Sequence, residues 1–236
     1  MTRPLLHISD LRKHFGGVKA IQGVSLDVFP NELVCVIGAN GAGKSTLLNM
    51  VCGVSRCDGG EISFDGIRLS GSPAFRFARA GILRKFQVPS VFPSLTVEEN
   101  LVVSAETSGK AAALSNLPDL MARLGLDAHA GRVAGELAHG LKQWLELGLC
   151  LVHEPKLLLL DEPTAGMTRE ESTRTALLVK ELSRTCTTIV VEHDMSFVGN
   201  LDCRTCVMHQ GQLIRDGKLD EIRNDSFIRD IYLGHH

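Results

Sequence analysis

The chain has 236 residues, of which 44% are hydrophobic, so it is long enough and apolar enough to bury a core as one domain. Its 25 basic and 27 acidic residues give a net charge of −2, which argues against a nucleic-acid partner. No run of roughly 18 apolar residues predicts a membrane span, and the first residues lack the apolar core of a secretory signal. We therefore expect a chain that stays in the cytoplasm.

The early segments predict strands separated by tight turns. Strand-like segments at 5–14, 25–28 and 61–64 are separated by turn residues. Phe15-Gly16-Gly17 follows the first segment, and Asp65-Gly66 follows the last. We expect these segments to pair as an antiparallel side sheet.

Three short apolar runs, at 32–37, 156–160 and 187–191, are each followed by a glycine-rich, acidic or polar turn. Helical patterns separate them, and this alternation is typical of an α/β fold in which helices cover a sheet. One of these helices is predicted over 170–184, with Ala176, Leu177, Val179 and Leu182 facing the core.

Helix formers dominate between about 93 and 148, and Thr96 followed by Glu98 and Glu99 is a plausible helix start. We predict a single domain over 1–236. Its core and β parts would occupy about 1–92 and 149–236, and a helical subdomain over about 93–148 would be inserted between them.

The strand at 32–37 leads into a phosphate-binding motif, G-x-x-x-x-G-K-[ST], which we call the phosphate loop. It consists of Gly38, Ala39, Asn40, Gly41, Ala42, Gly43, Lys44, Ser45 and Thr46. The glycines allow backbone N–H groups to approach phosphate oxygens, and the following helix adds its N-terminal dipole. Lys44 would bind the β- and γ-phosphates, and Ser45 would offer its hydroxyl to Mg²⁺.

Two carboxylates, Asp161 and Glu162, follow four leucines at 157–160. Taken alone, the pair is equally compatible with an ordinary strand end. Together with the phosphate loop, it indicates acids delivered to the ligand-binding edge of a sheet. Because neighbouring strand residues point to opposite sides, we expect Asp161 to hold Mg²⁺ and Glu162 to deprotonate the attacking water.

His193 follows the strand at 187–191, again where a strand ends. A solitary histidine is usually structural, but three strand ends at one edge make His193 a candidate contact for the γ-phosphate. Gln87, between Phe86 and Val88, has no interpretation from spacing alone.

In this order, these motifs resemble the ABC ATPase family over essentially the whole chain. The resemblance implies a P-loop NTPase core that uses ATP and Mg²⁺. It also implies roles for individual residues: Phe15 stacks on adenine, Gln87 senses Mg²⁺ and the transmembrane partner, Glu162 is the catalytic base, and His193 is the switch histidine.

The chain departs from the family at the signature, where L-S-G-G-Q is replaced by residues 137–141. These are Leu137, Ala138, His139, Gly140 and Leu141. The missing serine hydroxyl and glutamine amide leave mainly Gly140 and the backbone N–H groups of a helix N-terminus to contact a nucleotide. One nucleotide site of a dimer is therefore expected to be weakened.

Within the family, the chain resembles the branched-chain amino-acid and urea importers. The endings 220–223 and 232–234 are similar to that group, and the segments 84–92, 142–146, 165–168 and 191–195 look like the urea-type ATP-binding subunit. Urea ranks above branched-chain amino acids here, and both remain open, because solute identity belongs to other subunits.

The resemblance implies a heterodimer with a second ATP-binding subunit, two transmembrane permeases and a periplasmic solute-binding protein. The chain would be peripheral, at the cytoplasmic face of the inner membrane. Leu141 motivates an alternative, a non-hydrolysing regulatory module, although Glu162 and His193 argue against it. A soluble ABC protein of DNA repair or translation is less favoured, since one phosphate loop and no heptads are present.

Overall fold

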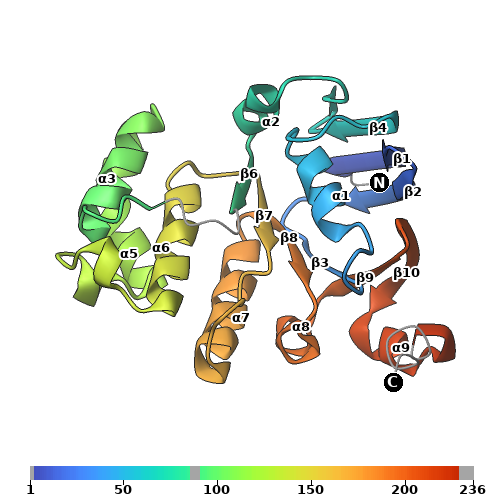
Figure 1. The fold of residues 1–236 in the computed structure, drawn as a ribbon. Coiled ribbons are helices and arrows are strands. Elements are labelled where there is room, and N and C mark those ends of the chain that lie inside the picture. Colours follow the sequence, from blue (N-terminus) through green and yellow to red (C-terminus); the bar gives the residue numbers. More distant parts are fainter. Residues whose placement is uncertain (1–2, 86–90, 229–236) are drawn as a thin grey trace.

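The computed structural model describes residues 3–85 and 91–228. Its centre is a six-stranded sheet, here called the core sheet, with the order β10-β9-β3-β8-β7-β6 (Figure 1). Its strands are β3 (Leu33–Ile37), β6 (Ile82–Lys85), β7 (Leu157–Asp161), β8 (Thr187–Glu192), β9 (Arg204–His209) and β10 (Gln212–Lys218). All neighbouring pairs are parallel except β9 and β10, so the strands from β6 to β9 end at the same edge.

Side chains alternate across the core sheet into two hydrophobic clusters. Leu157 and Leu159 of β7 join one cluster with α1 (Lys44–Val51) and the side sheet. Leu158 and Leu160 face the other cluster, with α7 (Arg169–Ser183) and α8 (Met195–Leu201). A sheet covered on both faces explains why these strands are continuously apolar rather than alternating.

The side sheet is antiparallel, as the sequence predicts, with the order β2-β1-β4-β5. It consists of β1 (Leu6–Phe15), β2 (Val18–Val28), β4 (Gly59–Phe64) and β5 (Ile67–Arg68). Strand β2 is longer than the predicted run at 25–28 because residues from Val18 onward pair with β1 across the Gly16-Gly17 turn. Buried and exposed side chains do not alternate regularly in that first part of β2, so its sequence carries no clear period-two pattern.

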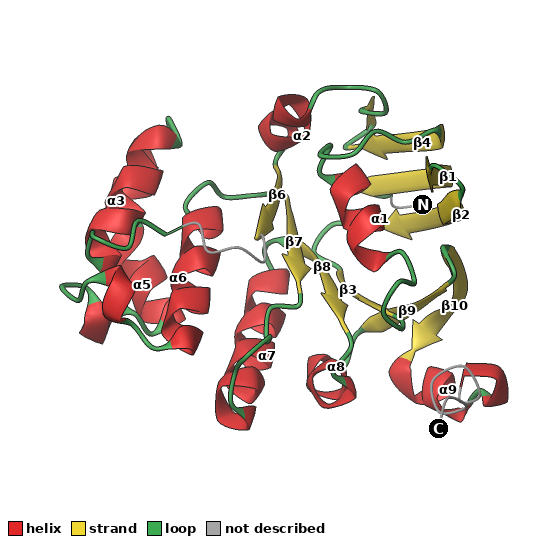
Figure 2. Cartoon of the chain, in the orientation of Figure 1, coloured by secondary structure: helices red, strands yellow, loops and turns green. Residues whose placement is uncertain are grey.

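A further group of helices, the helical segment, lies beyond strand β6, on the side of the core sheet away from the side sheet (Figure 2). It contains α3 (Val97–Thr107), α4 (Ala111–Ser115), α5 (Leu117–Leu124) and α6 (His139–Leu151). Helix α3 starts at the predicted Thr96 with a capping box, in which Glu99 N–H donates to Thr96 Oγ1 at 3.1 Å and Thr96 N–H donates to Glu99 Oε2 at 2.7 Å. Further short helices are α2 (Ala74–Ala80), α9 (Leu219–Asn224) and the 3-10 helices at Asp127–His129 and Ala134–Glu136.

One core prediction is wrong. Helix α7 buries Ala176, Val179 and Leu182, but Leu177 is 64% exposed. Leu177 follows Ala176 by about 100° around the helix, which turns it away from the sheet although its residue type is apolar.

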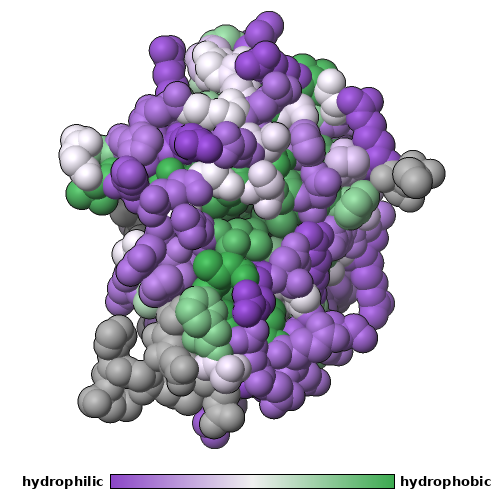
Figure 3. All heavy atoms as spheres, turned by 90° about the vertical axis from the view of Figure 1, so that its right-hand side faces the viewer, coloured by the Kyte–Doolittle hydropathy of each residue, from purple (hydrophilic) through white to green (hydrophobic). Residues whose placement is uncertain are grey.

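No helix within residues 3–85 and 91–228 combines the length and the apolar character needed to cross a bilayer. Figure 3 shows the face that lies at the right of Figure 1, and most of it is hydrophilic, with hydrophobic residues near its centre and in smaller areas elsewhere. Scattered apolar surface of this kind is ordinary for a folded domain.

Candidate functional site

A cavity of about 530 Å³ lies where β3 ends and α1 begins. The phosphate loop forms one wall, and Glu162 reaches it from the end of β7. Its lining residues are Val18, Lys19, Ala20, Gln22, Asn40, Gly41, Ala42, Gly43, Lys44, Ser45, Thr46, Glu162 and Gln210. The members from β2 and Gln210 belong to no motif, so only the fold could reveal them.

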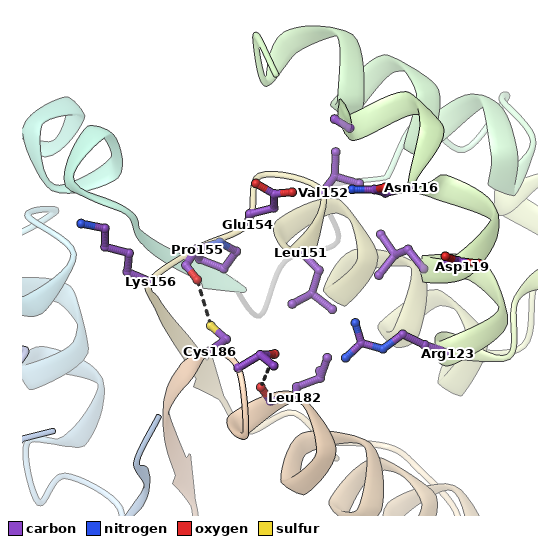
Figure 4. Close-up of a pocket in the computed structure, with 13 residues that line it drawn as sticks. Asn116, Asp119, Arg123, Leu151, Val152, Glu154, Pro155, Lys156, Leu182 and Cys186 are labelled. Atoms are coloured by element: carbon purple, nitrogen blue, oxygen red, sulfur yellow. Dashed lines mark hydrogen bonds between the residues drawn. The ribbon is translucent and has the colours of Figure 1, made fainter. Parts of the chain in front are cut away.

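A larger cavity, of about 600 Å³, lies at the amino-terminal ends of the core-sheet strands (Figure 4). Lys156 stands just before β7 and Cys186 just before β8, whereas Asp119 and Arg123 face the cavity from α5. Ligands of open parallel sheets bind at the carboxyl ends of the strands. The smaller cavity at the phosphate loop is therefore the candidate site.

Close packing explains two glycines of the phosphate loop. Gly43 has a φ of 103°, and a Cβ there would lie 2.6 Å from the carbonyl oxygen of Ala20. A Cβ at Gly38 would lie 2.4 Å from the carbonyl oxygen of Met208. Strands β2 and β9 thus press against the loop and hold it in the shape that exposes its N–H groups.

Lys44 lies inside the phosphate loop. Its Nζ donates to the carbonyl oxygens of Gly38 at 2.6 Å and Ala39 at 3.1 Å. Burial lowers the pKa of Lys44 below its ordinary value, although the nearby carboxylates of Glu162 and Asp161 act in the opposite direction. The ammonium is therefore held in place next to the acids that end β7.

Asp161 is the last residue of β7 and is 1% exposed. Its Oδ2 accepts from the guanidinium of Arg84 at 2.6 Å, whereas its Oδ1 is buried without a hydrogen-bond partner among the described residues. A buried carboxylate oxygen with no donor among the described residues fits the oxygen shell of Mg²⁺, as does the hydroxyl of Ser45, which lines the phosphate-loop cavity. The residues therefore suit this metal.

Glu162 lies outside β7 in a left-handed backbone conformation, with a φ of 47°. Its N–H donates to the carbonyl oxygen of Val191 at 2.9 Å. Its Oε1 lies 3.2 Å from Nδ1 of His193, and its side chain is 24% exposed. Glu162 lines the phosphate-loop cavity and Asp161 does not, and the left-handed turn at Glu162, which lies outside the strand, accounts for this difference in place of the expected strand alternation.

The sequence did not single out Glu192, the last residue of β8. It is 1% exposed and accepts from Thr164 Oγ1 at 2.6 Å and from the N–H of His193 at 3.0 Å. This carboxylate joins the loops that follow β7 and β8. A charged residue that ends a strand of threonines and aliphatic residues, directly before His193, was the available signal.

The signature residues lie at the start of α6, and none of them lines the phosphate-loop cavity. Ala138 is the N-cap and makes no side-chain cap hydrogen bond, so α6 begins with N–H groups that its cap side chain does not occupy. His139 Nε2 bonds to the carbonyl oxygen of Ala165 at 2.8 Å. Leu141 is partly buried against the cluster that contains α7.

The side chain of Glu171 limits the space around Gly140. A Cβ at this position would lie 2.3 Å from Oε1 of Glu171, near the start of α7.

One further predicted residue stands apart from the cavity. Phe15 is 53% exposed at the end of β1, with Lys13 Nζ 5.2 Å above its ring, and it does not line the cavity. Gln87 lies outside the described residues.

Residues 21–165 match the family model described as ABC transporter, and this range holds the phosphate loop, the signature and both acids. The chain belongs to the ABC transporter family. It is an ATP-binding ABC ATPase with the mixed α/β fold of that family.

Relatives of this ABC ATPase match it from end to end. The high-affinity branched-chain amino acid transport ATP-binding protein LivG of Escherichia coli is 36% identical over 253 aligned positions, covering 99% of each protein. BraF of Pseudomonas aeruginosa, which carries the same description, is 33% identical with the same coverage. The crystal structure of an ABC transporter ATP-binding cassette in its ADP conformation has a TM-score of 0.89 at 29% identity, covering 99% of this chain and 100% of that one.

Proposed function

We propose that this ABC ATPase energises the import of branched-chain amino acids. The observation that supports this proposal is the match, over 99% of each protein, to ATP-binding subunits described for that transport. The expectation of urea rested on short segments such as 142–146 and 165–168, and none of these relatives supports it. A match over the whole length carries more weight than local segments, so the branched-chain alternative becomes the main proposal.

ATP would bind at the phosphate loop. The N–H groups of residues 38–46 and the N-terminus of α1 favour phosphate, and Lys44 adds a positive charge. Phe15, beside Lys13, is proposed to stack on the adenine.

Hydrolysis would be carried out by the acids at the strand ends. Mg²⁺, when bound, supplies positive charge that neutralises phosphate oxygens. Ser45 and Asp161 are proposed to hold it, with Gln87 completing its surroundings. Glu162, which faces the cavity, would accept a proton from the attacking water, and His193 would contact the γ-phosphate.

The site would be completed by a second ATP-binding subunit. Its signature would face this chain's nucleotide, while Ala138, His139, Gly140 and Leu141 would face the partner's. We further propose that residues 93–148 act as the helical subdomain that couples closure to two transmembrane permeases. A periplasmic solute-binding protein would deliver the solute, and the chain would sit peripherally at the cytoplasmic face.

Purification from native membranes tests this proposal. An affinity-tagged chain should bring down two permeases and a second ATPase, and the complex in liposomes should take up radiolabelled leucine with ATP. Uptake of urea but not leucine would overturn the solute assignment. A complex that binds ATP yet releases no phosphate would instead favour the regulatory module.

A further inference from the structure

A buried polar chain connects α1 to β7 through Arg84 of β6. The Nη1 atom of Arg84 donates to Asn49 Oδ1 at 2.5 Å, and its Nη2 atom donates to Asp161 Oδ2 at 2.6 Å. The side chains of Arg84 and Asp161 are only 6% and 1% exposed. Charges buried this deeply are tolerated when paired with good geometry, and the planar guanidinium serves both partners with separate nitrogens.

Asn49 stands four residues after Ser45 on α1, so the two side chains share one face of the helix. The polar chain therefore runs from the helix turn that follows Ser45 to the carboxylate of Asp161. These are the two residues proposed above to hold Mg²⁺. With Oδ2 held by Arg84, Oδ1, which has no partner in the part of the chain that the structure describes, is the oxygen left for the metal.

We propose that Arg84 is a positioning residue for the metal. It fixes the rotation of the Asp161 carboxylate and, through Asn49, the spacing between α1 and β7. Ser45 and Asp161 are thereby arranged for Mg²⁺ before it binds. Groups that orient metal ligands typically change metal affinity by about 10- to 100-fold when removed. The inference rests on the proposed assignment of Ser45 and Asp161 to Mg²⁺.

Lysine is the informative substitution at this position. Arg84→Lys keeps the buried positive charge but supplies a single ammonium in place of a fork, so it cannot hold Asn49 and Asp161 in the same geometry. Asn49→Ala removes the tether to α1 and leaves the Arg84–Asp161 ion pair intact. The second variant decides the matter if the first does not fold.

Arg204 provides a matched control. It donates to Asp216 through Nε at 2.7 Å and Nη2 at 2.6 Å, the same type of arginine–carboxylate contact. It begins β9, whose start pairs with the start of β3, at the edge opposite the phosphate loop. Arg204→Lys should therefore change no metal property.

The test measures Mn²⁺, a paramagnetic substitute for Mg²⁺, binding to the ADP-loaded full chain by electron paramagnetic resonance. We expect Arg84→Lys to weaken Mn²⁺ binding about tenfold or more, and Asn49→Ala to weaken it about three- to tenfold. Affinity for a fluorescent ADP analogue in EDTA should stay unchanged. Circular dichroism and thermal melts establish which variants fold.

Asp161→Asn distinguishes the positioning role of Arg84 from the assignment of Asp161 to Mg²⁺. If it weakens Mn²⁺ binding while Arg84→Lys and Asn49→Ala bind like wild type, the positioning role of Arg84 is overturned and the Mg²⁺ assignment stands. If Asp161→Asn itself binds Mn²⁺ like wild type, the assignment is overturned and the inference with it.

Discussion

The Nδ1 atom of His193 lies 3.2 Å from the Oε1 atom of Glu162. The two residues follow neighbouring parallel strands, β8 and β7, and the N–H of Glu162 is bonded to Val191 just upstream of His193. Backbone pairing therefore fixes this contact. A base and a partner held by the backbone need little rearrangement when a nucleotide arrives.

Glu162→Gln should preserve ATP binding and slow hydrolysis. The amide keeps the shape of the side chain but cannot accept a proton, and loss of a general base typically costs about 10²- to 10⁴-fold in rate. Phosphate release from the assembled complex measures the effect. Wild-type turnover in this variant would rule out Glu162 as the base.

Lys44→Ala should weaken ATP binding about tenfold or more, because a hydrogen bond to a charged group typically contributes about 1.5–3 kcal/mol. Titration with a fluorescent ATP analogue measures the affinity. Lys156→Ala is the control, since Lys156 pairs with Asp65 and precedes β7 at the opposite sheet edge. Equal affinity of both variants would remove the phosphate-loop assignment.

Glu192→Gln should destabilise the fold and lower turnover together. The carboxylate accepts from Thr164 and from the N–H of His193, whereas an amide would present a donor to one of these two donors. A buried donor left unsatisfied costs about 1–3 kcal/mol. Urea unfolding measures the loss, and Thr164→Val, which removes one hydroxyl donor, should have a smaller effect on both readouts.

Much of this site follows from sequence because its motifs are local. The phosphate loop needs glycines, a lysine and a helix start at fixed spacing, and the capping box of α3 occupies four consecutive residues. Alternation of strands and helices likewise predicted the core sheet, and tight turns between the early strands predicted the antiparallel side sheet. The structure confirms both.

Strand β6 was missed because its last two residues, Arg84 and Lys85, are charged. Both side chains are nevertheless buried, since Arg84 pairs with Asp161 and Lys85 Nζ lies 3.2 Å from Glu146 Oε2. Partners distant in sequence decide whether a charge can be buried. The positioning contacts of the site therefore appear only once the fold is known.

Leu141→Gln should raise ATP hydrolysis by the isolated chain more than by the assembled complex. Alone, any homodimer would use the Leu141 signature at both sites, whereas a partner would supply a better signature to this chain's own site. Because Leu141 packs partly against the core, the substitution should also lower stability slightly, by about 1 kcal/mol. Phosphate release from wild type and variant, each alone and with partners, makes the comparison. No hydrolysis in all four samples, despite ATP binding and assembly, would favour the regulatory module.

Acid should destabilise the chain in part through His153. Burial, together with the charge of Lys110, lowers the pKa of His153 below its ordinary value of 6.5. The unfolded chain therefore takes up this proton at a higher pH than the folded chain, so stability is lost as the pH falls below that value. His153→Gln should flatten this pH dependence between pH 7.5 and 5, which urea unfolding at a series of pH values measures. An unchanged slope would contradict it.

The close approach of Glu171 to Gly140 gives a second reason for a glycine in the signature, besides contact with a nucleotide. Glu171 also forms the capping box of α7 with Thr168, so a side chain at position 140 would disturb the start of a helix in the same chain. Gly140 therefore contributes to folding as well as to the signature, because a larger residue would have to displace the side chain of Glu171. The presence of Gly140 therefore does not by itself indicate that this signature still serves a partner's nucleotide.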